Sequence, residues 1–309
     1  MFQPVPPFNG AGWTAVLEHD RRNPQPVHKG KEIIIRASKW ITAHKAVNLI
    51  RSAKSLLSGE PPFSDDEFIP FNENEPEFSN PFVQKNQKER YWSTDNLPLA
   101  CAIAAKASRK RKWVYAISKY SFSISLFSIC HVDLDPSFGA EHFPISKLPD
   151  DHIRFCHSII SAYSSIEDLG LEIRASAKNP SRIKGQWNPK VKNDLENRLI
   201  KGNIDLSESL LWTERGPKRK TEIKRPLDHM KKARWSYGIN RDIEVNIVEA
   251  IARADWLRDC VASHDVKDLT PSLSPYDIIN LQHLSRRLIL ENLGFWGYHQ
   301  KKMNRKDEK

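Results

Sequence analysis

Apolar residues recur every three or four positions through most of the second half of the chain, which is the spacing along one face of an α-helix. Such stripes are present in residues 113–131, 150–176, 239–264 and 274–295. The clearest stripe consists of Phe155, Ile159, Ala162, Ile166, Leu169 and Ile173. A helix of this kind buries its apolar face against another element, because it cannot shield that face alone. We therefore predict a mainly α-helical protein.

Other segments extend this pattern toward the N-terminus. Ser38 is expected to cap a helix that ends at Gly59, and another helix begins at Leu97. Residues 113–131 allow two interpretations, because serines alternate with apolar residues in the middle, as in a strand, while the repeat over the whole segment is helical. The length of the segment favours a helix. Residues 33–35 fit either a short strand or the approach to a helix.

Two regions interrupt the helical pattern. Residues 60–82 hold seven acidic residues, five prolines and no basic residue, which predicts an acidic linker; the alternative is a mimic of nucleic-acid charge that shields a basic groove. Residues 176–238 are basic and contain one short helical stretch near 191–199, so we interpret them as an insertion between core helices. The predicted domains are an N-terminal region (1–95), a helical domain (96–300) and a polar tail (301–309).

The charge balance favours an anionic partner. The chain holds 48 basic and 38 acidic residues, a net charge of +10, which favours nucleic acid without proving it. The four cysteines (Cys101, Cys130, Cys156 and Cys260) are far apart, so neither a disulfide framework nor a zinc site is expected. The N-terminus does not resemble a signal peptide, and no apolar run approaches the ~20 residues of a membrane span. We expect a soluble, cytoplasmic protein without a membrane partner.

The sequence lacks the short motifs of several large enzyme classes, such as a glycine-rich phosphate loop, His-Glu-x-x-His and Gly-x-Ser-x-Gly. The remaining chemical pattern is the stretch WLRDCVASH, which places Arg258, Asp259 and His264 at the end of a predicted helix. Arginine presents a planar charged fork to a phosphate, and histidine exchanges protons near neutral pH. These residues are either part of an active site or ordinary polar residues of the surface.

Helix geometry constrains how Arg258 and His264 can act together. On a straight helix their side chains point about 120° apart, because six residues turn the helix by about 600°. They converge only if the helix ends before His264, or if a second copy of the motif completes the site, as a two-fold dimer provides. The helix end and the adjacent Asp265 both favour a protonated imidazole, which suits a general acid. The spacing alone is weak, since Arg22 and His28 share it across two prolines that exclude a helix.

The context of the motif is more specific. Arg258 and His264 close a long amphipathic helix, and a short linker leads to a last amphipathic helix that begins with Ser-Pro-Tyr-Asp. This arrangement resembles the HEPN superfamily, which comprises small helical ribonucleases with an Arg, four to six residues and then a His. A polar residue often follows the Arg in that family, and Asp259 fits. The resemblance covers residues 97–175 and 239–297.

The resemblance implies a fold and an activity. The fold would be a HEPN-like four-helix bundle with an inserted basic segment and a smaller N-terminal region. The activity would be that of a metal-independent endoribonuclease without a cofactor, in which the 2′-OH of the RNA attacks and leaves a 2′,3′-cyclic phosphate. His264 would be the general acid and base, Arg258 would bind the scissile phosphate, and Asp259 would orient Arg258. Glu167 is either a further partner of Arg258 or an ordinary boundary glutamate.

Basic clusters are the candidate RNA-binding surface. One lies in residues 106–112 and another in residues 215–234. The candidate phosphate contacts are Arg109, Lys110, Arg111, Lys112, Lys218, Arg219, Lys220, Lys224 and Arg225. Tryptophans beside these stretches are candidates for stacking on unpaired bases, although such residues more often belong to a core. They are Trp113, Trp187, Trp212 and Trp235.

The expected partners are RNA, a second copy of the chain, and an antitoxin or other regulatory protein. By analogy with the family, the biological role would be that of a toxin or an antiviral abortive-infection effector. The main alternative is a non-catalytic HEPN-like module that binds RNA or a nucleotide, or mediates an interaction. A DNA-binding regulator is a third possibility, but no helix-turn-helix pair stands out in the sequence.

Overall fold

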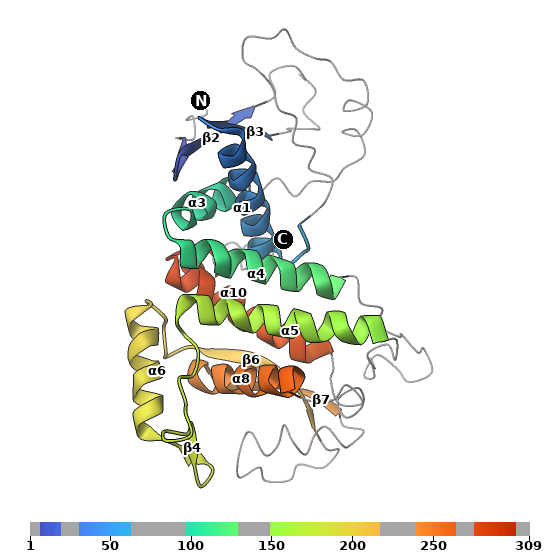
Figure 1. Ribbon diagram of the computed structural model, residues 1–309, viewed down its shortest axis with the longest axis vertical. Coiled ribbons are helices and arrows are strands. Elements are labelled where there is room, and N and C mark those ends of the chain that lie inside the picture. The colour runs from blue at the N-terminus through green and yellow to red at the C-terminus, as the bar shows by residue number, and fades with distance from the viewer. Residues whose placement is uncertain are drawn as a thin grey trace. The chain divides into compact units, whose positions relative to one another are not determined.

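The computed structural model of this protein describes residues 7–19, 31–62, 97–128, 149–216, 239–263 and 275–300 (Figure 1). Helices account for 66% of the described residues, which confirms the prediction of a mainly α-helical chain. No helix in these ranges is long and apolar enough to cross a membrane. The chain divides into two compact units. The N-terminal unit comprises Met1–Lys54 and Pro62–Arg109, and the C-terminal unit comprises Ser55–Pro61 and Lys110–Lys309.

The N-terminal unit contains a three-stranded antiparallel sheet that is largely absent from the sequence-based prediction. Its elements are β1 (Phe8–Gly10), β2 (Trp13–His19), β3 (Lys31–Ala37), most of α1 (Trp40–Ser58) and α3 (Leu97–Ala107). The strand order is β1-β2-β3, with β3 where the sequence allowed a short strand. Trp13 and Ala15 are buried, whereas Asn9 and Arg36 are exposed, so the sheet has one covered and one open face. Gly59 ends α1 with a φ of 74°, as expected for a glycine that follows a helix.

The C-terminal unit is built around a helix that is packed on several sides. Its longer helices are α4 (Arg111–Ser128), α5 (Pro149–Leu169), α8 (Ile247–Ser263) and α10 (Pro275–Asn292). α5 contacts α4, α8 and α10, and Figure 1 shows α5 between α4 and α8. These helices correspond to the four predicted stripes. The stripe of α5 supplies the buried side chains Phe155, Ile159, Ala162, Ile166 and Leu169.

The serines that made residues 113–131 resemble a strand lie in the contact between α4 and α5. The hydroxyls of Ser123 and Ser158 are 3.0 Å apart and buried, and Ser158 donates to the backbone carbonyl of Ser123. One turn away, Ser161 donates to the carbonyl of Lys119 at 2.9 Å. Small hydroxyl side chains let two helices approach closely and satisfy their own hydrogen bonds there. The segment is therefore a helix, as its length indicated.

One predicted helix begins later than expected. Residues 239–246 form the strand β7 (Ile239–Asn246), which pairs antiparallel with β6 (Ser209–Gly216), and α8 starts only at Ile247. The prediction of a helix from residue 239 is therefore wrong over its first eight residues. The physical reason is visible in the burial, because Val245 is buried while Asp242, Glu244 and Asn246 are exposed, which is the alternation of a strand.

The described part of the predicted insertion packs against the helices. The predicted short helix near 191–199 is present as α6 (Pro189–Lys201), and the Asn188 side chain caps it by accepting from the Lys190 N–H. The short strands β4 (Arg182–Ile183) and β5 (Gln186–Trp187) precede α6. Arg182 donates to both carboxylate oxygens of Glu249 on α8, at 3.0 and 2.9 Å. This bidentate ion pair fastens the region to the first turn of α8.

Candidate functional site

The last turns of α8 place Arg258 against α5. Its Nη2 donates to Oδ1 of Asp255 at 2.9 Å, one helical turn earlier. Its Nη1 lies 3.6 Å from Oε1 of Glu167 on α5, and its Nε lies 3.2 Å from Oδ1 of Asp259 without forming a hydrogen bond. The guanidinium is therefore held by carboxylates from two helices. We call Arg258, Asp255, Asp259, Glu167 and Tyr163 the Arg258 cluster.

Tyr163 supports Arg258 from the buried side of this cluster. It is fully buried on α5, and its ring lies under the guanidinium, with the Arg258 Cζ 4.7 Å from the ring centre. Its hydroxyl donates to Oδ1 of Asp255 at 2.6 Å, the same oxygen that accepts from Arg258. Ser164 donates to Oε2 of Glu167 at 3.0 Å. The cation–π contact with Tyr163 and the shared Asp255 carboxylate fix the position of the Arg258 guanidinium on its buried side.

The structure brings together three of the four residues predicted for the active site. Arg258, Asp259 and Glu167 lie in one cluster, and the pairing of Glu167 with Arg258 is present. The fourth residue, His264, lies outside the described residues, as does Asp265. The described range 239–263 ends at Ser263, the last residue of α8, so the cluster lies shortly before the histidine in the sequence.

Burial and charge act in opposite directions on the ionisable groups of the cluster. Burial raises the pKa of Asp255, although the hydrogen bonds from Tyr163 and Arg258 oppose this effect. Burial also raises the pKa of Tyr163, and the neighbouring Asp255 charge adds to it, so the phenol stays protonated and remains a donor. For Arg258, partial burial lowers the pKa, but the hydrogen bond to Asp255 and the nearby negative charges outweigh it and raise the pKa. Arg258 is therefore a permanent cation.

The carboxylates limit what Arg258 can bind. Three carboxylates surround one guanidinium, so an incoming phosphate meets a site with excess negative charge when all of them are ionised. The three are not equivalent, because Asp255 is tied by two hydrogen bonds whereas the Asp259 side chain is 62% exposed. Asp259 lies at the Nε edge of Arg258 and is the more exposed of these two carboxylates. The arrangement thus favours Asp255 as the inner support of Arg258 and Asp259 as the carboxylate that an incoming anion meets first.

Asp255 and Tyr163 were not predicted from the sequence as members of the site. Asp255 precedes Arg258 by three positions, a spacing at which side chains on a helix are neighbours, so the sequence did contain this signal. Tyr163 precedes Glu167 by four positions and shares its side of α5. No sequence signal connects Tyr163 with Asp255, because their contact depends on how α5 packs against α8.

The residues predicted to contact phosphates belong to different parts of the chain. Arg109 belongs to the N-terminal unit, where its Nη2 lies 3.5 Å from the carbonyl oxygen of Asn9. Lys110, Arg111 and Lys112 are exposed at the start of α4 in the C-terminal unit. The remaining predicted contacts lie outside the described residues: Lys218, Arg219, Lys220, Lys224 and Arg225.

The candidate stacking tryptophans are mostly structural. Trp113 and Trp212 are buried, so a nucleic-acid base cannot reach the faces of their rings. Trp187 is partly buried, and its indole N–H donates to Glu249 beside the Arg182 ion pair. Trp235 lies outside the described residues. The core interpretation of these residues therefore holds for Trp113 and Trp212.

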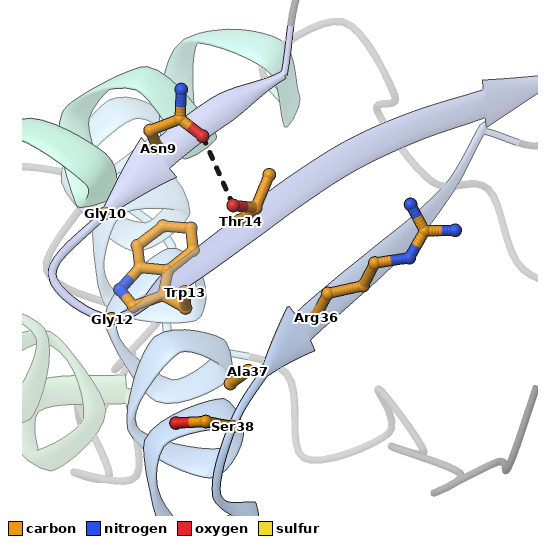
Figure 2. Close-up of a pocket in the computed structure, with 8 residues that line it drawn as sticks. All are labelled: Asn9, Gly10, Gly12, Trp13, Thr14, Arg36, Ala37 and Ser38. Atoms are coloured by element: carbon orange, nitrogen blue, oxygen red, sulfur yellow. Dashed lines mark hydrogen bonds between the residues drawn. The ribbon is translucent and has the colours of Figure 1, made fainter.

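A shallow pocket of about 510 Å³ lies in the N-terminal unit, at one end of the β1–β3 sheet (Figure 2). The register aligns Asn9 with Thr14 and Thr14 with Arg36, which forms a polar row across the three strands. The Thr14 hydroxyl donates to Oδ1 of Asn9 at 3.2 Å. Gly10 is required beside this row, because a Cβ there would lie 2.0 Å from the Trp13 ring. The pocket holds no acid–base pair or nucleophile that would point to a reaction.

Within the described ranges, no group of three or more His, Cys, Asp or Glu side chains is arranged to hold a metal ion. Among the residues that the structure describes, the Arg258 cluster is the group of charged side chains that includes the predicted active-site residues. Comparison with known proteins adds nothing to this assignment: no protein-family model, no curated protein and no solved structure matches the chain.

Proposed function

We propose that this chain is a metal-independent endoribonuclease of the HEPN type. The observation that carries the proposal is the position of Arg258, which is held by Asp255, Glu167 and the Tyr163 ring at the end of α8, six residues before His264. This arginine is supported on its buried side by Asp255 and Tyr163, and the carboxylate of Asp259 beside it is mainly exposed. Such an arginine is suited to bind a phosphate whose negative charge increases in the transition state. In this proposal, α4, α5, α8 and α10 form the HEPN-like bundle.

The proposed reaction needs no group from outside the chain and the RNA. The 2′-OH of the RNA attacks the adjacent phosphorus, and the bond to the 5′ oxygen of the next nucleotide breaks. His264 moves the proton that leaves the 2′-OH or the proton that the departing oxygen takes up. Arg258 stabilises the negative charge on the phosphate oxygens during this exchange. The products are a 2′,3′-cyclic phosphate and a 5′-OH.

The further parts of the proposal follow the family resemblance. The active form would be a homodimer in the cytoplasm. Arg258 of one copy and His264 of the other would converge on one phosphate, because on one straight helix the two side chains point apart. The biological role would be that of a toxin or an antiviral effector, held in check by an antitoxin or another regulatory protein.

Cleavage of a labelled RNA by the purified protein tests the proposal. His264→Ala is expected to lower the rate by roughly two to four powers of ten, the usual contribution of general acid–base catalysis. Arg258→Ala is expected to be comparably damaging. His157→Ala, at an exposed histidine of α5, is the matched control and should leave the rate unchanged. Cleavage should persist in EDTA, and a 2′-deoxy nucleotide at the cleaved position should block it.

One observation favours a second candidate, a non-catalytic module that binds RNA or a nucleotide. The three carboxylates around Arg258 resemble a structural ion-pair network as much as a phosphate site. RNA binding without any cleavage, unchanged by His264→Ala, would support this alternative. Cleavage that EDTA abolishes, or that survives His264→Ala, would show that the proposed active site is wrong.

A further inference from the structure

The outer face of α4 carries two exposed aromatic rings. Tyr115 is 45% exposed and Phe122 is 57% exposed, although aromatic side chains of this size are usually mostly buried. Seven residues separate them, so they point to the same side of the helix and lie about 10.5 Å apart along its axis. Arg111, four residues before Tyr115, lies on the same side.

Basic side chains lie beside Tyr115 and in the turn that precedes it. The Arg111 guanidinium lies 5.0 Å from the centre of the Tyr115 ring, and its Nη2 donates to the Tyr115 hydroxyl at 3.2 Å. Lys110 and Lys112 are exposed in the turn that precedes Tyr115. Lys119 lies between the levels of the two rings and pairs with Asp168 at 2.8 Å. We call Lys110, Arg111, Lys112, Tyr115 and Phe122 the α4 surface.

We propose that the α4 surface binds single-stranded RNA, with one unpaired base stacked on Tyr115 and another on Phe122. This inference rests on the proposed function in that RNA is the ligand, and it specifies that the bound strand is unpaired. Lys110, Arg111 and Lys112 contact the phosphates beside the first base. The contact of Arg111 with Tyr115 holds that ring in place before RNA arrives, which reduces the entropy lost on binding.

The spacing of the rings selects a single strand. Successive bases of a duplex cover each other's faces, so no base face is open to a protein ring except at an end. Rings about 10.5 Å apart on one helix therefore engage bases that are splayed out of a continuous stack. Stacking of this kind tolerates any base, since every base has a flat face.

Charge argues against a second copy of the chain as the occupant. In a two-fold dimer the same patch meets itself, so two copies of Lys110, Arg111 and Lys112 would enter one interface and raise its positive charge. The described α4 surface includes no acidic residue that would offset this charge. A polyanion satisfies both the basic residues and the rings.

The test uses binding alone, with an RNA that this chemistry cannot cleave. A fluorescein-labelled oligonucleotide with 2′-O-methyl groups throughout has no free 2′-OH, so anisotropy reports affinity without cleavage. Replacing Tyr115 or Phe122 by Ala is expected to weaken binding by about fivefold or more for each ring. Tyr115→Phe keeps the ring and should bind much as the parent does. Tyr298→Ala, at a 68% exposed tyrosine of the same unit, is the matched control and should have no effect.

Two further measurements separate stacking from charge. The Ala variants should leave the salt dependence of binding unchanged, whereas Arg111→Gln and Lys112→Gln should each flatten its slope by about 0.7. A fully paired duplex of the same sequence should bind the parent and the Ala variants equally. Parental affinity for the single strand in the Tyr115→Ala, Phe122→Ala double variant would overturn the proposal. A change of sedimentation mass in that variant would also overturn it, because the surface would then bind a second copy.

The outcome is independent of the proposed reaction. A protein that binds the uncleavable strand through the α4 surface but never cuts ordinary RNA would keep this inference and refute the nuclease. A protein that cuts RNA normally after both Ala substitutions, with unchanged affinity, would keep the nuclease and refute this inference. A parent protein that does not bind the methylated strand would also refute this inference, while the cleavage assay still decides the nuclease.

Discussion

Asp255 is the residue on which the Arg258 cluster depends most directly. It accepts from both Tyr163 and Arg258 through one oxygen, and burial raises its pKa. A carboxyl group whose pKa is higher in the folded state binds more protons there than in the unfolded state. Its contribution to stability is therefore present at acidic pH and is lost as the pH rises through the raised pKa.

This loss of stability with rising pH gives a prediction for the variant Asp255→Asn, whose side chain cannot ionise. The free energy of unfolding of the parent, relative to that of the variant, should fall as the pH rises above about 4, the ordinary pKa of an aspartate, because burial raises the pKa of Asp255 in the folded state. Urea unfolding at a series of pH values measures this difference. Asp259→Asn, at a 62% exposed side chain, is the control for the change in net charge. A parental advantage that grew with pH would contradict the assignment of Asp255 as a buried carboxylate.

Arg287 on α10 is one of two charged residues, with Asp151, of which only 1% of the surface is exposed among the residues that the structure describes. Its Nε donates to Glu291 at 2.7 Å, its Nη2 lies 3.2 Å from Glu208, and its other donors reach the carbonyls of Asp205 and Ser209. Removing one partner of such a pair leaves the other as an uncompensated buried charge. Breaking this network is therefore expected to destabilise the protein by more than the intact network contributes to its net stability.

Arg287→Met is accordingly expected to lower the free energy of unfolding by about 3–5 kcal/mol, because Glu291 is left buried without its partner. Arg174→Met is the matched control, since it breaks an exposed pair with Glu172 and should cost at most about 1 kcal/mol. Urea midpoints compare the two. The double variant Arg287→Met, Glu291→Met should recover part of the loss. Equal effects of the two single variants would contradict the difference in burial.

At the scale of elements, Asn280 of α10 pairs with the backbone of β6 in the β6–β7 hairpin, in addition to the contact of Arg287 with Ser209. Asn280 accepts from the Thr213 N–H at 3.0 Å and donates to the Thr213 carbonyl at 2.8 Å. The amide thus pairs with β6 as a neighbouring strand would. Asn280→Ala leaves both backbone groups without a partner and should cost about 1–3 kcal/mol for each group that stays buried. Thr213→Val, which removes only the hydroxyl that donates to Asp242, is the control. Hydrogen exchange of the Thr213 amide should increase in Asn280→Ala alone.

The helices could be predicted from the sequence and the strands largely could not, for physical reasons. A stripe such as that of α5 is a local pattern, and both of its ends carry local signals. The strand β7 was hidden because Ile243 and Ile247 are four residues apart, so the helical stripe of α8 appeared to extend backward. The sheet of β2 and β3 pairs segments separated by residues 20–30, without a two-residue turn signal.

The candidate site was predictable to a similar degree. Arg258 and Asp259 lie within one motif, and Glu167 was considered because its position flanks the apolar stripe of α5. The contact of Tyr163 with Asp255, by contrast, exists only once α5 and α8 pack together. The exposed rings of Tyr115 and Phe122 on α4 were also not predicted. Only tryptophans beside basic stretches were considered for base stacking, and two of these, Trp113 and Trp212, are buried in the core.

At the scale of the molecule, the two proposed RNA contacts lie on different sides of one helix. α4 and α8 both pack against α5, with α5 between them (Figure 1). The rings are on α4 and Arg258 is on α8, so a strand that is held on Tyr115 and Phe122 must pass α5 to reach Arg258 of the same copy, unless Arg258 of a second copy receives it.

A mixing experiment tests whether a second copy completes the active site. The chain mass is 35.6 kDa, and the proposed dimer should sediment at about twice this value. If each site combines Arg258 of one copy with His264 of the other, a mixed dimer of Arg258→Ala and His264→Ala copies contains one intact site. With random exchange about half of the dimers are mixed, so about a quarter of the parental cleavage rate should return. A site built within one copy would stay inactive in every mixture. Each variant alone, at the same total concentration, is the control, and a monomeric protein that cleaves RNA would exclude the shared site.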